Sequence, residues 1–324
     1  MSKFCSSTPS ISVCITYHNE SGWLYECLLS LKNQTRLPDE VLVFDDCSNV
    51  RPEKFIPTGM NVRIIRSEKN IGQGLARNHM FAISKCQYVH AHDADDLFSN
   101  NWCETIYKEI NLNHKNPDLI ISEYNKFNGQ NIRVYAGGEF LRIGTEDSLL
   151  QFCMKENFVP SAVVYRREFF LKLGGYKPRE AYPVSEDFEL HLRMALENPV
   201  YKVICQPLTL QRWRKNSSCR DNNGEMRLET LILCVKALQE HADRIPENLK
   251  PLYQRKLIHL GKAYFIRGKI RDADQLFTQA AALGKLPFIY SFGPRMNKIA
   301  SIFGYSAAFR LRYPWKLIPK KRLL

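Results

Sequence analysis

The sequence lacks acidic residues over its last fifty positions, since no Asp or Glu follows Asp274. Nine Lys or Arg lie in the same stretch, and the 324-residue chain carries a formal net charge of +13 at pH 7. A basic terminal segment favours an acidic membrane surface or nucleic acid. The charge is confined to this segment and comes with no nucleic-acid recognition motif, so we expect no nucleic-acid partner.

Other absences narrow the class of protein. The ten cysteines contain no C-x-x-C pair, which argues against a zinc site and against a secreted disulfide framework. Residues 1–10 have no apolar core of the signal-peptide type. No stretch approaches the ~18 apolar residues that span a bilayer. We therefore expect a cytoplasmic protein, either in solution or bound peripherally to the inner face of the cytoplasmic membrane.

Hydrophobic residues make up 44% of the chain and charged residues 24%, which is an ordinary globular balance. The length suits one large α/β domain and a smaller module. Strand-type patterns alternate with helical ones, which predicts a mostly parallel sheet with helices on its faces. Ser21 is expected to cap the first helix. The predicted strands are 11–16, 40–44, 62–65 and 88–91, and helices are predicted near 23–31, 75–84 and 102–110.

Polar clusters follow three of the predicted strands, at Thr16–Asn19, Asp45-Asp46 and Asp93–Asp96. Ligands of open α/β sheets bind beyond the carboxyl ends of the strands. The third cluster places three carboxylates in four positions, and these repel one another unless a cation lies among them. Hard oxygen ligands of this kind suit a divalent metal. The alternative is that Asp96 caps the following helix.

The motifs, taken in order, resemble those of the family 2 glycosyltransferases, which are inverting enzymes with the GT-A fold. The resemblance covers about residues 10–220. It implies an α/β fold of the nucleotide-sugar-binding GT-A type with a mostly parallel sheet, followed here by an α-helical C-terminal region. The motifs that carry it are Ile15–Glu20, Phe44–Ser48, Asn70–Asn78, Asp93–Asp96, Gly174–Tyr176 and Ser185–Asp187.

The resemblance implies a donor site. Thr16, His18 and Asp46 would line the pocket for the nucleobase, and Asp46 would accept a hydrogen bond from uracil N–H, which favours a uridine donor. His18 stands where many members of the family have Tyr, and the alternative is an ordinary loop histidine. Arg77 would pair with a phosphate or hold the base pocket, the alternative being a surface salt bridge.

The resemblance also implies the chemical roles. Asp93 and Asp95 would hold Mn²⁺ or Mg²⁺ together with the donor diphosphate, with Asp93 contacting the donor as well, and Asp96 is a further candidate. Asp187 would be the general base that deprotonates the acceptor hydroxyl. Its neighbour Glu186 is a further candidate. The alternative for this pair is an acidic helix start that the helix dipole stabilises.

A downstream segment, residues 211–218, resembles the stretch that closes over the diphosphate in relatives. Either Arg214 or Arg212 would meet phosphate, with Arg214 as the stronger candidate. Many relatives carry His at the position of Arg214. Trp213 is expected either to contact an acceptor sugar or to pack in the core.

The expected domains are 10–220, a GT-A catalytic domain, 221–290, a helical region, and 291–324, a basic amphipathic tail. The helical region contains one pattern that resembles a tetratricopeptide-type hairpin, carried by Leu257, Leu260-Gly261, Tyr264, Ala273, Phe277 and Ala280. In the tail, aromatic and basic residues together suit an anionic membrane surface. The alternative is a tail packed on its own domain.

The leading hypothesis is a metal-dependent hexosyl- or N-acetylhexosaminyltransferase. It would use a nucleotide sugar, with UDP-sugar favoured, and act on a glycan or lipid-linked acceptor in surface polysaccharide synthesis. The second hypothesis is a non-catalytic nucleotide-sugar-binding or scaffold protein that acts through its helical C-terminal region. Turnover with an acceptor separates the two.

Overall fold

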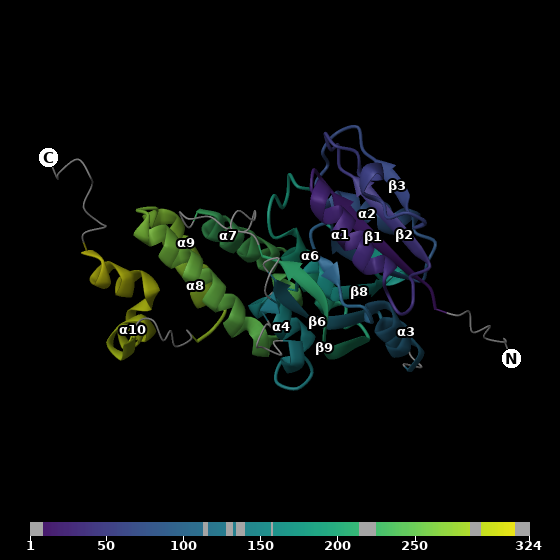
Figure 1. Cartoon of the computed structure of the whole chain (residues 1–324). Coiled ribbons are helices and arrows are strands. Elements are labelled where there is room, and N and C mark those ends of the chain that lie inside the picture. The colour runs from purple at the N-terminus through teal and green to yellow at the C-terminus, as the bar shows by residue number, and fades with distance from the viewer. Residues whose placement is uncertain are drawn as a thin grey trace. The chain divides into compact units, whose positions relative to one another are not determined.

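The chain forms two compact units, Met1–Ser217 and Ser218–Leu324. The structure, a computed structural model, describes residues 9–112, 116–127, 132–133, 140–156, 158–213, 225–285 and 293–314 (Figure 1). The strands of the first unit are β1 (Ile11–Tyr17), β2 (Glu40–Asp45), β3 (Arg63–Arg66), β4 (Tyr88–Asp93), β5 (Leu97–Phe98), β6 (Leu119–Phe127), β7 (Ile132–Arg133), β8 (Val163–Arg166) and β9 (Tyr201–Arg212). Its helices are α1 (Ser21–Lys32), α2 (Gln73–Ile83), α3 (Trp102–Leu112), α4 (Leu149–Lys155), α5 (Arg167–Lys172) and α6 (Glu186–Leu196).

The described strands form one sheet in the order β3-β2-β1-β4-β8-β6-β9-β5, with β7 paired to β6. The block β3-β2-β1-β4 is parallel throughout. Beyond it, β8 runs antiparallel to both β4 and β6, while β6 and β9 are parallel. The predicted α/β class is confirmed. The parallel block is the part of the sheet whose strands the sequence pattern predicted.

Strand β1 is buried on both faces, as strands of a helix-covered parallel sheet are. Its residues Ile11, Val13 and Ile15 pack in a cluster with α1 and α3. Cys14, which points to the opposite face, belongs to a second cluster that includes Ala76 and Met80 of α2. The two clusters fix the parallel block between helices, so the loops at its carboxyl edge have a rigid base.

The start of α1 differs from the prediction. Glu20 occupies the N-cap position, and Ser21 is the first helical residue, so the assignment of Ser21 as the cap is wrong. The Glu20 side chain makes no capping hydrogen bond. One of its carboxylate oxygens instead accepts a hydrogen bond from the backbone N–H of His18, at 2.7 Å. Glu20 therefore fixes the loop that leaves β1.

The second unit is helical, with α7 (Glu225–Glu240), α8 (Lys250–Ile266), α9 (Ile270–Ala282) and α10 (Gly293–Arg312). Helices α8 and α9 form the hairpin that the spacing of small and apolar residues predicts. Gly261 of α8 lies against the ring of Phe277 in α9, and Gln254 of α8 donates a hydrogen bond to the carbonyl of Ala280, at 2.9 Å. No helix in the described parts of the chain is long and apolar enough to cross a bilayer.

Replacing Gly261 by Ala is expected to lower the free energy of unfolding by about 1–2 kcal/mol. Alanine is the better helix former by roughly 1 kcal/mol, but a Cβ at position 261 would lie 2.5 Å from Cε1 of Phe277. That ring is stacked on Phe309 at 5.1 Å, so it cannot move without a further packing loss. Urea unfolding measures the change. Gly22→Ala in α1 is the control, because no atom lies within 4 Å of its added Cβ, and equal effects of the two substitutions would contradict the packing argument.

Candidate active site

The carboxyl ends of β1, β2 and β4 bring the predicted site residues to one edge of the sheet. In the strand register Thr16 of β1 lies beside Asp93 of β4, and Tyr17 lies beside Asp45 of β2. The Thr16 hydroxyl is 3.4 Å from Oδ1 of Asp93. The first and third polar clusters of the sequence are therefore in direct contact.

A hollow opens at this edge between the β1 loop and α2. It brings together Thr16, His18 and Asp46, the three residues predicted to line a nucleobase pocket. Its other lining residues are Tyr17, Glu20, Gln73 and Ala76. Sequence reasoning missed Glu20 and Gln73, although both stand inside the motifs that carry the family resemblance.

Asp46 is buried, and both of its carboxylate oxygens accept backbone hydrogen bonds. Ile71 N–H donates at 2.7 Å and Gly72 N–H at 2.9 Å. Gly72 has φ of 85°, a conformation that glycine adopts without strain. Asp46 therefore ties the loop before α2 to the end of β2. A carboxylate has about four lone-pair positions, so two amide donors leave it able to accept from a ligand.

His18 is exposed at the rim of the hollow, and both nitrogens of its ring have polar partners. Its Nδ1 lies 2.8 Å from the carbonyl oxygen of Asp46, and its Nε2 lies 3.3 Å from the side-chain amide of Asn19. Asp45, by contrast, is fully buried. It accepts a hydrogen bond from Ser48 N–H at 2.8 Å and pairs with Arg66, so it supports the turn after β2.

Arg77 of α2 lies beneath the acidic cluster. Its side chain is 1% exposed, and its Nη2 is 2.7 Å from Oδ1 of Asp93, whose side chain is 26% exposed. Its Nη1 is 3.9 Å from Glu186. Burial opposes the charged guanidinium, but Asp93 and then Tyr176 and Glu186 outweigh it, so the pKa of Arg77 is raised. The alternative of a surface salt bridge is wrong, because the pair is held from inside the protein.

Helix α6 begins with the predicted base. Ser185, before it, has φ of 61°, and the carboxylate of Asp187 accepts a hydrogen bond from Phe188 N–H at 2.8 Å. Burial is the main cause that raises the pKa of Tyr176 to about 12, and the charges of Asp187 and Glu186 add to it. Asp187 and Glu186 therefore lie close enough to influence Tyr176 electrostatically. The guanidinium carbon of Arg77 lies 5.4 Å from the centre of the same ring.

Comparison with known proteins identifies the family of this chain. The family model described as glycosyl transferase family 2 matches residues 12–174. The chain belongs to glycosyl transferase family 2. The match includes the β1 loop, Asp46, Arg77 and the acidic cluster, and it ends just before Gly175-Tyr176 and α6.

Among curated proteins, the chain is 28% identical over 118 residues to glycosyltransferase GlyG of Streptococcus pneumoniae, a match that spans 35% of this chain and only 38% of that protein. It is 26% identical over 226 residues to the Escherichia coli UDP-Gal:alpha-D-GlcNAc-diphosphoundecaprenol beta-1,3-galactosyltransferase, covering 66% of this chain and 78% of that one.

Among solved structures, S. aureus TarS 1-349 in complex with UDP-GlcNAc is similar with a TM-score of 0.63 at 16% identity, covering 95% of this chain and 92% of that chain. The mannosyltransferase PcManGT from Pyrobaculum calidifontis, in complex with GDP-Man and Mn²⁺, gives a TM-score of 0.57 at 17% identity, covering 96% and 88%. Both structures support the GT-A fold of this family 2 chain.

The acidic cluster of the family 2 domain has the chemistry of a divalent-cation site. Asp95 and Asp96 are buried, while Asp93 is partly open. Burial, followed by the charges of Asp93 and Asp95, raises the pKa of Asp96 well above its ordinary value. The three carboxylates therefore repel one another, and hard oxygen donors of this kind suit a divalent cation. The contacts from Thr16 and Arg77 both fall on Oδ1 of Asp93.

Asp96 has a structural task that the sequence left open. It accepts hydrogen bonds from Arg212 N–H at 2.9 Å and from the hydroxyl of Ser161 at 3.3 Å. Strand β5 follows it directly, so the alternative that Asp96 caps the next helix is wrong. Asp96 therefore links the end of β9 to the loop that carries the acidic cluster.

Arg212 faces the protein rather than an open phosphate site. Its Nε donates to the carbonyl of Asp95 at 2.9 Å, and its Nη2 lies 2.5 Å from Glu26. The guanidinium lies over the rings of Trp23 and Phe127, at 5.6 and 4.5 Å. It therefore connects α1, the acidic loop and β9.

Trp213 follows Arg212 and is 40% exposed. Its backbone N–H donates to the carbonyl of Phe127 at 2.7 Å, so the backbone is fixed while the indole reaches the surface. This exposure disfavours the core alternative. Arg214 lies outside the described residues.

Sequence reasoning missed one pair of hydrogen bonds between α2 and the turn before α6. The side chain of Asn78 donates to the carbonyl of Tyr176 and accepts from its N–H, both at 2.8 Å. Gly175 has φ of 68°, and a Cβ there would lie 2.3 Å from Oδ1 of Asn78. Both residues lie in motifs that carry the family resemblance. Their contact could not be predicted, because two positions about a hundred residues apart leave no local pattern in the sequence.

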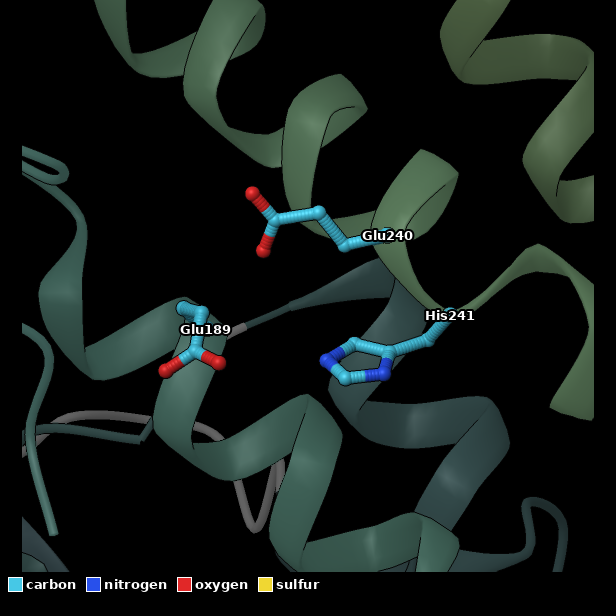
Figure 2. A group of neighbouring side chains, drawn as sticks. All are labelled: Glu189, Glu240 and His241. Carbon is cyan, nitrogen blue, oxygen red and sulfur yellow. The ribbon is translucent and has the colours of Figure 1, made fainter. Parts of the chain in front are cut away.

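Figure 2 shows three side chains of metal-ligand type outside this edge, Glu189, Glu240 and His241. Glu189 lies on α6 of the first unit, and Arg193 donates to both of its carboxylate oxygens at 2.8 Å. Glu240 is the last residue of α7 in the second unit and lies 3.9 Å from Lys236, and His241 follows the helix. Glu189 is thus neutralised within its own helix, and no metal site is assigned to this group.

Proposed function

We propose that the protein is an inverting, metal-dependent glycosyltransferase. It moves a hexosyl or N-acetylhexosaminyl group from a nucleotide sugar, with UDP-sugar favoured, to a hydroxyl of a glycan or lipid-linked acceptor. The observation that carries the proposal is the connected edge of the sheet. There Arg77 joins the acidic cluster, through Asp93, to the start of α6, which carries Asp187.

The donor half of the proposal uses the hollow beside β1. Thr16, His18 and Asp46 contact the nucleobase and ribose, and Asp46 accepts from uracil N–H with its remaining lone pairs. Asp93 and Asp95 hold Mn²⁺ or Mg²⁺, and Arg214 contacts the donor diphosphate. The bound cation neutralises charge on the leaving diphosphate. The Mn²⁺ complex of PcManGT and the UDP-GlcNAc complex of TarS support these ligand classes.

The acceptor half uses Asp187 as the general base. Its carboxylate takes the proton of the acceptor hydroxyl, whose oxygen forms a bond to the anomeric carbon of the donor sugar. The bond from that carbon to the phosphate oxygen breaks, and the nucleoside diphosphate leaves with the electron pair. One displacement inverts the configuration, as with the paired carboxylates of inverting glycosidases. Trp213 offers its exposed ring to the acceptor sugar.

The setting we propose is surface polysaccharide synthesis at the inner face of the cytoplasmic membrane, with the protein bound peripherally. The E. coli relative, whose name specifies a diphosphoundecaprenol-linked acceptor, supports a lipid-linked substrate. The second candidate, a non-catalytic nucleotide-sugar-binding scaffold, would bind the donor and never turn over. The acid at position 187 favours the enzyme.

A screen of nucleotide sugars by thermal shift tests the donor site. With Mn²⁺ and a UDP-sugar at a hundred times its Kd, stabilisation of about 2.7 kcal/mol corresponds to a rise in Tm of roughly 5–10 °C. EDTA and the Asp95→Ala substitution should each abolish most of this rise, because both remove the diphosphate's counter-charge. Asp243→Ala, which removes an exposed carboxylate of the second unit, is the matched control. A shift with GDP-mannose alone would overturn the uridine assignment, and a metal-independent shift would overturn the cation site.

A further inference from the structure

We propose that α10 is a docking surface for an anionic lipid bilayer. The proposal goes beyond glycosyl transfer and does not depend on the donor site. It rests on two features of the same helix, which are a group of strongly exposed apolar side chains and a local excess of positive charge.

Helix α10 is bent and firmly attached within its unit. Gly304, with φ of 81° and ψ of 165°, breaks it into two helical stretches. The second stretch packs on α9, where the ring of Phe309 stacks on Phe277 at 5.1 Å with an angle of 7° between planes. Asp274 of α9 pairs with Arg310 at 2.6 Å and accepts from the hydroxyl of Ser306. The attachment means that the outward residues of α10 are displayed by a fixed scaffold.

The inward residues of α10 account for its own packing. Ala300, Tyr305, Ala308 and Phe309 are buried. Three large apolar side chains point away from this contact. Ile302 is 62% exposed, Phe303 is 69% exposed and Leu311 is 65% exposed. Among the described residues Leu112 alone, at 63%, matches them, so strongly exposed apolar side chains concentrate on α10.

The charge around these side chains has one sign. Arg295 and Lys298 are exposed on the first stretch, and Arg312 closes the second. The whole stretch 275–324 contains nine Lys or Arg and no Asp or Glu. Arg310 pairs with Asp274, while Arg295 and Lys298 are exposed and carry the positive charge of the first stretch.

A bilayer with anionic headgroups fits both features. Basic residues are attracted to its surface, while Ile, Phe and Leu side chains enter the boundary between headgroups and acyl chains. A second copy of the chain would bring the same positive charge to the contact, which disfavours self-association through this face. A nucleic acid would satisfy the charge and leave the apolar side chains in water.

Flotation of the full chain with vesicles tests the proposal. The protein should bind vesicles of phosphatidylcholine with 30% phosphatidylglycerol (about a third anionic lipid, enough for a strongly negative surface) and should bind pure phosphatidylcholine weakly. The double substitution Ile302→Ser/Phe303→Ser should weaken binding by about tenfold or more, since it removes the inserted side chains. Lys298→Glu should weaken binding to the anionic vesicles alone. Leu112→Ser, at an equally exposed position on α3, should leave binding unchanged.

Three outcomes would overturn the proposal. One is equal flotation of the wild type and the Ile302→Ser/Phe303→Ser variant with both folded by circular dichroism. Another is that Leu112→Ser weakens vesicle binding, relative to the wild type, as much as the double substitution does. The third is a change from dimer to monomer in the double variant, seen by ultracentrifugation, with vesicle binding unchanged, which would make the face a subunit contact. Sugar transfer to a water-soluble acceptor should be the same in all these variants, so failure here is distinguishable from failure of the proposed enzyme function.

Discussion

Asp187→Asn is expected to lower the rate of sugar transfer by about 10²–10⁴-fold, the usual contribution of a positioned general base. Asparagine keeps the size of the side chain and an oxygen that can accept from Phe188 N–H, the contact that Asp187 makes at 2.8 Å. It cannot take a proton from the acceptor hydroxyl. Donor binding, which uses the β1 hollow and the acidic cluster, should be unchanged in a thermal-shift titration with the same nucleotide sugar.

A comparison with another acid in the first turn of a helix separates this role from a structural one. Were Asp187 only an acid in the first turn of α6, its loss would cost up to about 1 kcal/mol of stability and little activity. Glu168→Gln, at the start of α5 with its side chain 87% exposed, shows the size of such an effect. Similar transfer rates for the two variants would refute the base assignment.

The fold could be predicted from the sequence because its signals are local. Ile11, Val13 and Ile15 alternate in the sequence, and that alternation places them together against α1 and α3. The positions of the carboxyl edge followed from the same strands, since polar residues at the ends of parallel neighbours must meet. Direct contact between Thr16 and Asp93 is the outcome.

The contacts that specify the site could not be predicted, because they join distant positions. Nothing near Asp46 reveals that Ile71 and Gly72 donate to its two oxygens. The sequence suggested that either Arg214 or Arg212 meets a phosphate, and Arg212 instead contacts Asp95 and Glu26. In each case tertiary packing decides which of several polar partners a side chain reaches.

The same limit applies to the C-terminal helices. The tail was expected either to bind an anionic membrane surface or to pack on its own domain. The structure shows packed and exposed side chains along one helix. Phe309 packs on Phe277, while Ile302 and Phe303 remain exposed, because Gly304 bends the helix between them.

Arg77→Met is expected to lower both stability and metal-dependent donor binding. Methionine fills a similar volume but removes the charge that pairs with Asp93 at 2.7 Å and approaches Glu186 at 3.9 Å. Breaking a buried pair by removing one partner costs about 3–5 kcal/mol, and the lower end applies because Asp93 is 26% exposed. Without Arg77 the Asp93 carboxylate loses its orientation, so the affinity for Mn²⁺ should fall by roughly 10–100-fold.

Two further variants separate the positioning role of Arg77 from a general loss of stability. Arg167 also donates to α2, through the carbonyls of Phe81 and Ala82 at 2.8 and 2.6 Å, and it touches no residue of the acidic cluster. Arg167→Met should therefore reduce the free energy of unfolding and leave the Mn²⁺ dependence of donor binding unchanged. Arg77→Lys keeps the charge with fewer donors and should recover part of the metal affinity. Equal Mn²⁺ titrations of donor-induced stabilisation for Arg77→Met and Arg167→Met would show that Arg77 acts only in folding, whereas a selective loss in Arg77→Met means that α2 holds the metal-binding carboxylate in place from below.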